Sequence, residues 1–375
     1  MTKIGKILFA LAVFLFITML VIYPAKFIAV SREAIRLCLD VIIPSLFPFL
    51  VAVGILVRLG LPRYMSRNLS PLMRPLFNIP GSGALALIMG LISGYPLGAK
   101  IARELYESGD CTKYEAERML AFCNNSGPLF IVGAVGAGML FSPGIGHILY
   151  ISHVLSAILV GMLFKFYRRG GEPLLLPTNS ITVRKKLDSG IVGSIGDAIQ
   201  SALFSMAKIC GFVVLFAAIV AALPNFGGDI ANASVAGIFE ITEGILRFAA
   251  ISSMPQSLKL AIISFVLSFS GFSVMAQVAA IVKPIGLSMK PYVIGKLLAG
   301  LISAGITYVV CMILSMNLEL SAQVFAPRYE FRYLIPMLLP AELFFRSLTA
   351  IAWCVAGIVV TVVIVRVFFR NEKQA

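Results

Sequence analysis

The chain has 375 residues, of which 59% are hydrophobic and 13% are charged, and its mean hydropathy is +0.97. A soluble domain carries about 25% charged residues, so this chain has too little polar surface to cover a core in water, and lipid is its expected solvent. The formal net charge of +14 comes from basic residues scattered over the loops between apolar stretches. This favours attraction to anionic lipid and argues against nucleic acid as a partner.

Eight stretches contain no Asp, Glu, Lys or Arg and approach or exceed the roughly 20 apolar residues that a membrane span needs. They are 7–25, 41–57, 75–99, 119–164, 209–228, 260–282, 297–318 and 347–365. The stretch 119–164 is long enough for two helices, joined at the turn Ser142-Pro143-Gly144-Ile145-Gly146. The first stretch is too long for the apolar part of a cleaved signal peptide, so we expect it to be a membrane helix.

The basic residues predict the orientation in the membrane. Lys3 and Lys6 precede the first span, the segment 165–186 is rich in Lys and Arg, and Arg366 and Arg370 lie near the end of the chain. Lys and Arg collect in cytoplasmic loops. Both termini and the central loop are therefore predicted to be cytoplasmic in a multi-pass membrane protein.

Two apolar segments do not fit as simple spans. If 81–100 crossed the membrane, every later loop would change sides, and its motif Ser93-Gly94-Tyr95-Pro96-Leu97-Gly98 is typical of a turn. The segment 234–250 has the same problem from the opposite face, and polar residues and a glycine interrupt it at Glu240, Thr242, Glu243 and Gly244. We predict that each is a re-entrant hairpin. Irregular backbone at membrane depth is tolerated only where protein or a watery cavity covers it, so two hairpins predict a cavity.

The order of elements repeats along the chain. The octapeptides that begin at Asp40 and at Asp197 share Asp, Ile, Leu and Phe at equal spacing. Each copy opens a helix that leads to a hairpin, then to a helix broken at a Ser-Gly pair (126–127 or 270–271), then to a plain span. The predicted fold is an all-α polytopic membrane protein with about eight transmembrane helices and two re-entrant hairpins, in two inverted-topology repeats with broken helices.

This organisation divides the chain into five parts. Residues 1–30 are an N-terminal transmembrane helix, and 31–167 are the first repeat of helix, re-entrant hairpin, broken helix and helix. Residues 168–190 are a basic cytoplasmic loop, 191–318 are the inverted second repeat, and 319–375 are a loop and a C-terminal transmembrane helix.

The hairpin tips and helix breaks are the predicted substrate site. An unwound turn frees backbone N–H and C=O groups, each of which costs several kcal/mol if it is left unmet in lipid. Amide and hydroxyl side chains can bind a solute there, and the N-termini of half-helices favour an anionic group. The candidate binding residues at the tips and breaks are Ser93, Gly94, Tyr95, Asn124, Asn125, Ser126, Gly127, Glu240, Thr242, Glu243, Ser270, Gly271 and Ser273.

Two basic residues complete the candidate site, and each has alternatives. Lys208, within a span, can neutralise a substrate carboxylate, pair with a hairpin glutamate, or extend its ammonium group to the surface. Arg247 can pair with Glu243 four residues earlier, or can face the substrate. For the other candidates the alternative is structural, because Ser and Gly are common at helix contacts in membranes, and acids at a hairpin tip can simply be hydrated.

The sequence indicates no other chemistry. The six cysteines have no CxxC or metal-ligand spacing, and His147 and His153 are six residues apart, which places them on different faces of a helix. Hydrolase, nucleotide-binding and zinc-protease motifs are absent. We expect no enzyme activity, no metal site and no cofactor, while coupling to Na⁺ or H⁺ and association into a homo-oligomer stay open.

Three motifs resemble a known family. Asp40 to Phe49 (DVIIPSLFPF), Ser93 to Lys100 (SGYPLGAK) and Phe122 to Gly136 (FCNNSGPLFIVGAVG) look like the YlbJ, or SpoVV, family of sporulation integral membrane proteins. That family belongs to the nucleoside-recognition, or gate-domain, superfamily, and the resemblance covers roughly residues 30 to 320. The superfamily is similar in plan to concentrative nucleoside transporters, in which two re-entrant hairpins and two broken helices hold the substrate.

The resemblance implies a protein of endospore-forming bacteria that moves dipicolinate across the mother-cell-derived outer forespore membrane. Dipicolinate is a planar dianion, which half-helix N-termini with Lys208 or Arg247 would suit. The first tip departs from the polar and acidic tip of nucleoside transporters, because it carries Tyr95-Pro96-Leu97. Three hypotheses follow: a transporter of a small organic anion, a transporter of nucleosides or related solutes with or without a coupling cation, and a sporulation scaffold that transports nothing.

Overall fold

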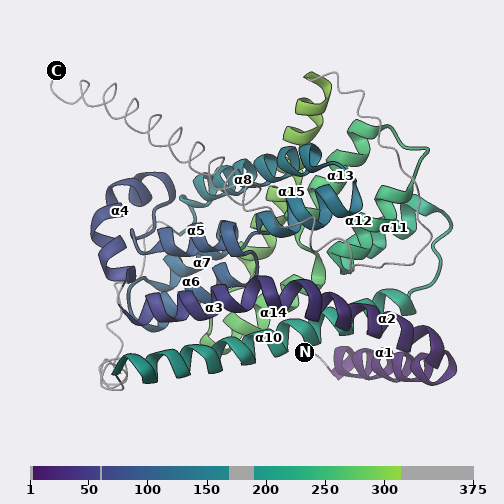
Figure 1. The fold of residues 1–375 in the computed structure, drawn as a ribbon, viewed down its shortest axis with the longest axis horizontal. Coiled ribbons are helices and arrows are strands. Elements are labelled where there is room, and N and C mark those ends of the chain that lie inside the picture. Colours follow the sequence, from purple (N-terminus) through teal and green to yellow (C-terminus); the bar gives the residue numbers. More distant parts are fainter. Residues whose placement is uncertain (1–2, 60, 169–189, 314–375) are drawn as a thin grey trace.

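The computed structural model describes residues 3–59, 61–168 and 190–313, and all regular secondary structure in these ranges is helical (Figure 1). By length and composition, four helical segments can cross a membrane: Pro143–Phe164, Ile195–Ala222, Gln256–Ile285 and Lys290–Ile313. A fifth is possible if Ile7–Ile22 and Pro24–Asp40, which meet at 101°, count together. The all-helical membrane fold is confirmed and the count of eight spans is not; the predicted span 347–365 lies outside the described residues.

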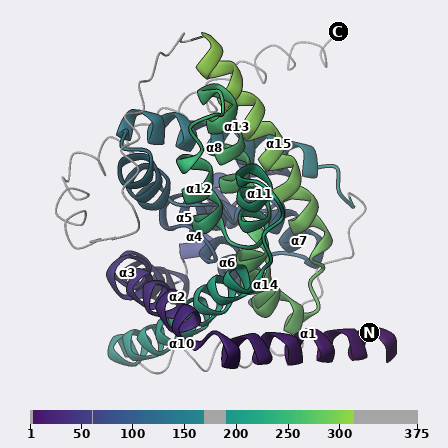
Figure 2. The ribbon, with the colours of Figure 1, turned by 90° about the vertical axis from the view of Figure 1, so that its right-hand side faces the viewer.

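The first unit opens with a long helical run. Helix α1 (Lys3–Ile22) ends before Pro24, whose ring favours the first turn of the next helix, α2 (Pro24–Leu37). Helix α2 continues through the π-helical segment η1 (Cys38–Ile42) into α3 (Ile43–Arg58). Because of the bend at Tyr23, α1 points away from the rest of the protein (Figure 2). The predicted boundary at residue 30 therefore falls inside α2.

A helical hairpin and a broken helix follow. After α4 (Leu61–Phe77), the hairpin consists of α5 (Gly83–Ser93) and α6 (Leu97–Glu107), with Gly94 at φ 92° in its turn. The next helix, α7 (Lys113–Phe122), begins with a capping box between Thr112 and Glu115. The chain then unwinds and resumes as the π-helical η2 (Leu129–Met139), followed by the long α8 (Pro143–Phe164).

The second unit has the same order of long helix, hairpin, broken helix and plain helix. Its elements are α10 (Gly190–Ala222), α11 (Asp229–Phe239), α12 (Ile241–Ala250), α13 (Gln256–Phe269), α14 (Gly271–Val282), η4 (Lys283–Ile285) and α15 (Lys290–Ile313). The break between α13 and α14 is at Ser270, which has the left-handed φ of 73°. The helices are thus interrupted near all four predicted positions. In the second unit each interruption is a single residue, Glu240 or Ser270, and the predicted residues Thr242, Glu243 and Gly244 lie inside α12.

The two units exchange equivalent contacts. Helix α6 packs on α14 as α12 packs on η2, and α7 packs on α15 as α13 packs on α8. The long helices α3 and α10 lie side by side (Figure 1) and run antiparallel, since Gly54 lies against Ala198 while Cys38 lies beside Cys210. A twofold relation between the units would produce these paired contacts.

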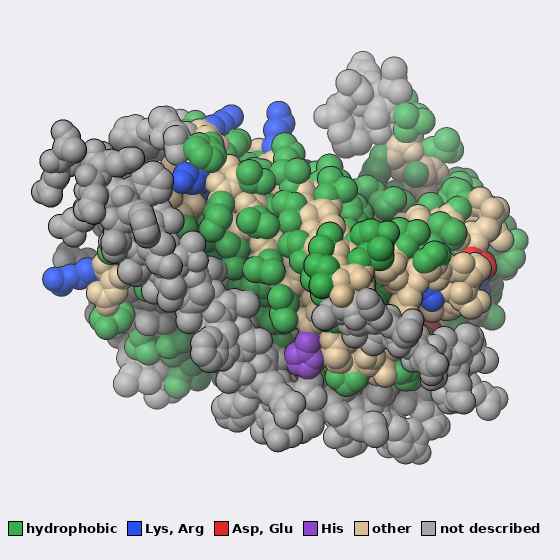
Figure 3. Space-filling view, turned by 90° about the horizontal axis from the view of Figure 1, so that it is seen from above, with side chains coloured by type: hydrophobic (Ala, Val, Ile, Leu, Met, Phe, Trp, Pro, Cys, Tyr) green, Lys and Arg blue, Asp and Glu red, His purple; other side chains and the backbone are tan. Residues whose placement is uncertain are grey.

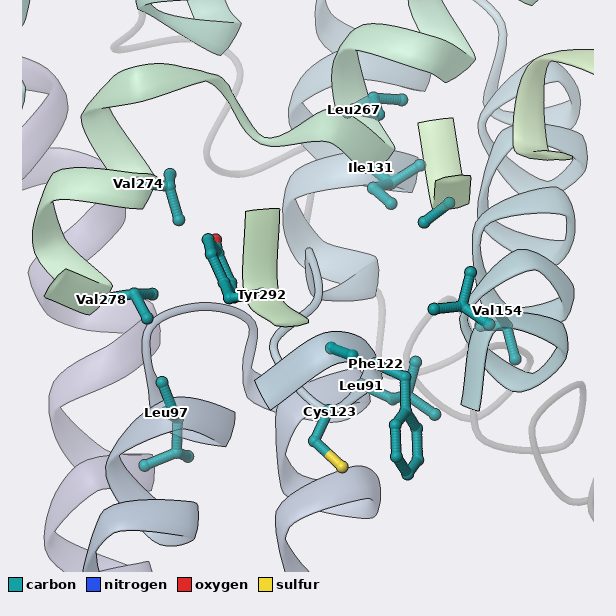
Figure 4. Packing of buried hydrophobic residues seen from close by; sticks show 14 of the residues in the cluster. Leu91, Leu97, Phe122, Cys123, Ile131, Val154, Leu267, Val274, Val278 and Tyr292 are labelled. Atoms are coloured by element: carbon teal, nitrogen blue, oxygen red, sulfur yellow. The ribbon is translucent and has the colours of Figure 1, made fainter. Parts of the chain in front are cut away.

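The core lies where the two units meet. Figure 4 shows side chains from α5, α6 and α7, such as Leu91, Leu97 and Phe122, near side chains from α14 and α15, such as Val274 and Tyr292. The exterior is also apolar: hydrophobic side chains cover the middle of the face in Figure 3, and charged side chains lie toward its margins. An apolar exterior of this kind suits contact with lipid.

The second hairpin is packed too closely for any side chain at its crossing point. A Cβ atom added at Gly244 would lie 2.2 Å from the Cα atom of Gly237. Overpacking of this kind costs about 1–3 kcal/mol, so we expect Gly244→Ala to lower the melting temperature of the purified protein by several degrees.

The matched control is Gly305→Ala on α15, where a Cβ atom would meet nothing within 4 Å. Alanine is better than glycine in a helix by about 1 kcal/mol, so the control should melt at or above the wild-type temperature. If Gly244→Ala and Gly305→Ala had the same melting temperature, the close packing of α11 on α12 would be contradicted.

Candidate functional site

A cavity of about 120 Å³ lies where the two hairpin tips meet the two helix breaks. The predicted residues that line it are Ser93, Gly94, Tyr95, Ser126, Gly127, Glu240, Thr242 and Ser273. Apolar residues complete the wall, among them Phe130, Ile209 and Val213. Segments far apart in the chain therefore share one small chamber whose walls are mostly apolar and carry a few polar groups.

Buried polar groups of the cavity wall lack a hydrogen-bond partner within the described part of the chain. The hydroxyl group of Ser93 and Oε1 of Gln277 are among them. An unsatisfied buried polar group costs about 1–3 kcal/mol, and such groups in native proteins usually bind water or a ligand. The cavity therefore offers hydrogen bonds that a bound solute can complete.

Four half-helices begin at or beside the cavity, and one of them is capped. Glu240 caps α12, because its Oε2 accepts a hydrogen bond from the Glu243 N–H at 2.8 Å. The N-cap residues of α6, η2 and α14 are Pro96, Pro128 and Ser270, and none of them caps its helix with a side-chain hydrogen bond. A helix N-terminus carries positive partial charge and unpaired N–H groups. The ends of η2 and α14 therefore favour an anionic group. At α6 the side chain of Asn124 already accepts a hydrogen bond from the Ala99 N–H.

Each break packs directly on the hairpin tip of its own unit. A Cβ atom at Gly127 would lie 2.9 Å from the Ile92 carbonyl oxygen, and one at Gly271 would lie 3.3 Å from the Phe239 carbonyl oxygen. Gly271 also has a φ of 62°, which glycine adopts without strain. Glycine at both breaks therefore allows backbone to approach backbone.

Asn124 and Asn125 lie behind the cavity wall, fully buried, where they bind neighbouring helices. Asn124 accepts a hydrogen bond from the Ala99 N–H and donates one to the Tyr292 hydroxyl, both at 3.4 Å. Asn125 donates to the Phe122 carbonyl oxygen at 2.7 Å and accepts from Nζ of Lys296 at 3.3 Å. These asparagines hold the first break in position and do not line the cavity.

His153 joins the first break to the second unit. The Ser126 N–H donates to Nε2 of His153 at 3.1 Å, and Nδ1 lies 2.7 Å from the Ser268 hydroxyl oxygen. Because Nε2 accepts, the hydrogen-bond pattern assigns the ring proton to Nδ1, which donates to Ser268. One side chain of α8 thus contacts both broken helices.

The candidates Ser270 and Gly271 do not line this cavity, and the Ser270 hydroxyl donates to the Ser268 carbonyl oxygen at 3.4 Å. Three further candidates lie elsewhere. Lys208 lines a second, larger cavity of about 440 Å³, which adjoins the first because both are lined by Ile209 and Gln277. Glu243 and Arg247 form an ion pair at 3.4 Å on the exposed part of α12. Of the two alternatives for Arg247, the structure thus shows the ion pair with Glu243.

Tyr292, Lys296, Gln277 and His153 belong to the site region and were missed by sequence reasoning. Lys296 was treated as the boundary of a span, but it lies inside α15 and is buried. His153 was considered only as a metal ligand. The signal that identifies both is a polar side chain inside an apolar helix, which in a membrane protein marks a functional position by default.

Comparison with known proteins identifies the family. The sporulation integral membrane protein YlbJ of Bacillus subtilis (strain 168) is 32% identical over 337 residues, which cover 81% of this chain and 82% of that protein. The chain belongs to the YlbJ family. The Gate family, described as nucleoside recognition, matches residues 39–167, a range that contains the first hairpin and the first break. The predicted resemblance is therefore confirmed. No solved structure matches the chain.

The role of His153 predicts a loss of stability on substitution. His153→Ala leaves the buried Ser126 N–H without its acceptor, which costs about 1–3 kcal/mol, so the melting temperature should fall by several degrees. His147→Ala is the control, because Nδ1 of His147 contacts only the Pro143 carbonyl oxygen one turn away, at an exposed position. If His153→Ala and His147→Ala had the same melting temperature, the hydrogen bond from the Ser126 N–H to His153 would not be what stabilises the first break.

Proposed function

We propose that this protein is a secondary membrane transporter of a small organic anion, with dipicolinate during sporulation as the proposed substrate. The observation that carries the proposal is one cavity that is lined by both hairpin tips, by the first break and by the first turn of α14 after the second break. Secondary transporters place their substrates between discontinuous helices, where irregular backbone lines a cavity instead of facing lipid. We propose no enzymatic reaction and no cofactor.

The proposed transport cycle rests on an inverted repeat. The antiparallel pairing of α3 with α10, and the exchange of contacts between the units, support a twofold relation in the plane of the membrane. Rocking of one hairpin unit against the other would then expose the cavity to each side in turn. In the proposed topology both termini and the central basic loop are cytoplasmic, and the membrane is the outer forespore membrane.

Two features support an anionic substrate. Two half-helix N-termini without side-chain caps, those of η2 and α14, lie at or beside the cavity. In the adjoining cavity, Arg103 pairs with Glu107, whereas Lys208 has no ion-pair partner among the residues that the structure describes. Lys208 is thus placed to attract a carboxylate before the solute reaches the smaller cavity. The apolar wall at Phe130 and Val213 suits the faces of a flat ring.

The alternative substrate is a nucleoside. The Gate family match and the uncharged polar groups of Ser93, Thr242, Ser273 and Gln277 in the cavity wall favour it. The third alternative is a scaffold role, in which the fold serves sporulation without moving a solute. The name of the Bacillus subtilis relative links that protein to sporulation and mentions no substrate.

Uptake of labelled dipicolinate into proteoliposomes tests the proposal. We expect accumulation well above that in empty vesicles, and much weaker uptake of pyridine-2,6-dicarboxamide, which has the same shape without charge. Thr242→Val removes one hydroxyl from the cavity wall and should lower dipicolinate uptake about tenfold, since a hydrogen bond to a charged group contributes about 1.5–3 kcal/mol.

The control variant is Glu243→Gln, one residue along on α12, because Glu243 is paired with Arg247 outside the cavity. It should transport like the wild type. Accumulation of uridine or of the dicarboxamide in place of dipicolinate would support the neutral-solute alternative. If a folded protein accumulates none of them, the transport proposal is wrong and the scaffold role is favoured.

A further inference from the structure

Lys296 is a lysine in the interior of the protein with an unusual environment. Its side chain is 1% exposed, and lysine is almost never fully buried unless it is paired. Among the residues that the structure describes, none forms an ion pair with Lys296, and its hydrogen bond goes to Oδ1 of Asn125 at 3.3 Å. The partner of this ammonium group is thus the amide oxygen of a residue in the first helix break.

The position of Lys296 is at the carboxyl end of α7. Helix α15 packs tightly there, since a Cβ atom added at Gly295 would lie 2.5 Å from the Ala121 carbonyl oxygen. The carboxyl end of a helix carries negative partial charge and unpaired carbonyl groups, and it favours a cation. The local field of the broken helix therefore offsets part of the cost that burial imposes on the charged form of Lys296.

The orientation of Asn125 is fixed for binding a cation. Its Nδ2 donates to the Phe122 carbonyl oxygen at 2.7 Å, which turns Oδ1 toward Lys296. An amide oxygen beside the carboxyl end of a half-helix is the kind of oxygen donor that alkali cations use in transporters with discontinuous helices. In this protein a side chain of the chain itself takes that place.

We propose that the ammonium group of Lys296 is a built-in cation of the first break, so that the protein needs no bound Na⁺ at this position. A second positive charge within a few ångströms would be repelled strongly in a medium of low polarity. The charged form of Lys296 therefore excludes an alkali cation from Asn125. This inference rests on the proposed function where it concerns the coupling of transport to Na⁺. The exclusion of Na⁺ from Asn125 does not depend on which solute is transported.

The surroundings supply no competing charge in the described residues. The titratable groups that face Lys296 are Cys123 of α7 and His153 of α8. His153 is held as a neutral ring by its two hydrogen bonds. On α13, Ser268 binds His153, whereas Ser264 binds Ser303, two turns beyond Lys296 on α15. The positive charge of the break thus depends on Lys296.

Thermal unfolding of the purified full-length protein tests the inference without any substrate. The wild type should melt at the same temperature in NaCl and in choline chloride of equal concentration. Lys296→Ala removes the cation and leaves space for another, so it should melt several degrees lower in choline chloride. NaCl or methylammonium chloride should restore part of this loss, because a small cation can then occupy the vacated place.

Two further variants keep the test decisive. Lys259→Ala removes another buried lysine, on α13 and away from Asn125, and NaCl or methylammonium should not restore its stability relative to choline. Lys296→Met keeps the length of the side chain without its charge and should also melt below the wild type. The inference is overturned if NaCl stabilises the wild type over choline, or if Lys296→Met melts like the wild type in choline chloride.

Transport gives a second readout. Solute uptake by wild-type proteoliposomes should be equal with NaCl and with choline chloride outside, and Lys296→Met should lower it at least tenfold. A requirement of the wild type for Na⁺ would overturn the inference even where uptake itself is confirmed. Absence of uptake by the wild type would contradict the proposed function, whereas the unfolding experiment would still decide the role of Lys296.

Discussion

The structure depends on one constraint: backbone groups that are freed in the middle of an apolar protein must find partners. At the first break the Ser126 N–H binds His153, and the carbonyl end of α7 is bound by Asn125. Unmet groups at this depth would cost several kcal/mol each. The broken helix of α7 and η2 is therefore possible only because polar residues of α8 and α15 bind its freed groups.

The partners come largely from the other unit, which couples the two halves of the protein. Tyr292 and Lys296 of α15 bind the asparagines of the first break, and His153 of α8 reaches Ser268, two residues before the second break. The interface between the units is therefore made through the site itself. Any movement of one unit relative to the other has to change these hydrogen bonds and, with them, the shape of the cavity.

The tips and breaks were predictable because their chemistry is local, whereas their partners were not. Gly94, Ser126-Gly127 and Ser270-Gly271 disfavour continuous helix wherever they occur, so the sequence is enough to locate them. Lys296 was predicted to end a span because charges rarely lie within one. Its burial depends on Asn125, 171 residues away in sequence, and only the fold brings the two together. Likewise, the stretch 7–25 is predicted to be one membrane helix, but the structure shows a bend of 101° between two helices that only together reach the length and composition of a span.

The two halves of the cavity differ in charge although they share a plan. Each unit contributes one N-terminus without a side-chain cap, that of η2 in the first unit and that of α14 in the second. The first unit also receives a hydrogen bond from Lys296 at Asn125 of its break. The second unit adds the carboxyl group of Glu240, which caps α12 and lines the cavity. A bound anion is therefore attracted toward the first tip and repelled from the second wherever Glu240 is ionised. An elongated solute with a carboxylate at one end would be oriented across the cavity by this field. The two repeated units together form the cavity, and the difference in charge between them sets the orientation of the solute inside it.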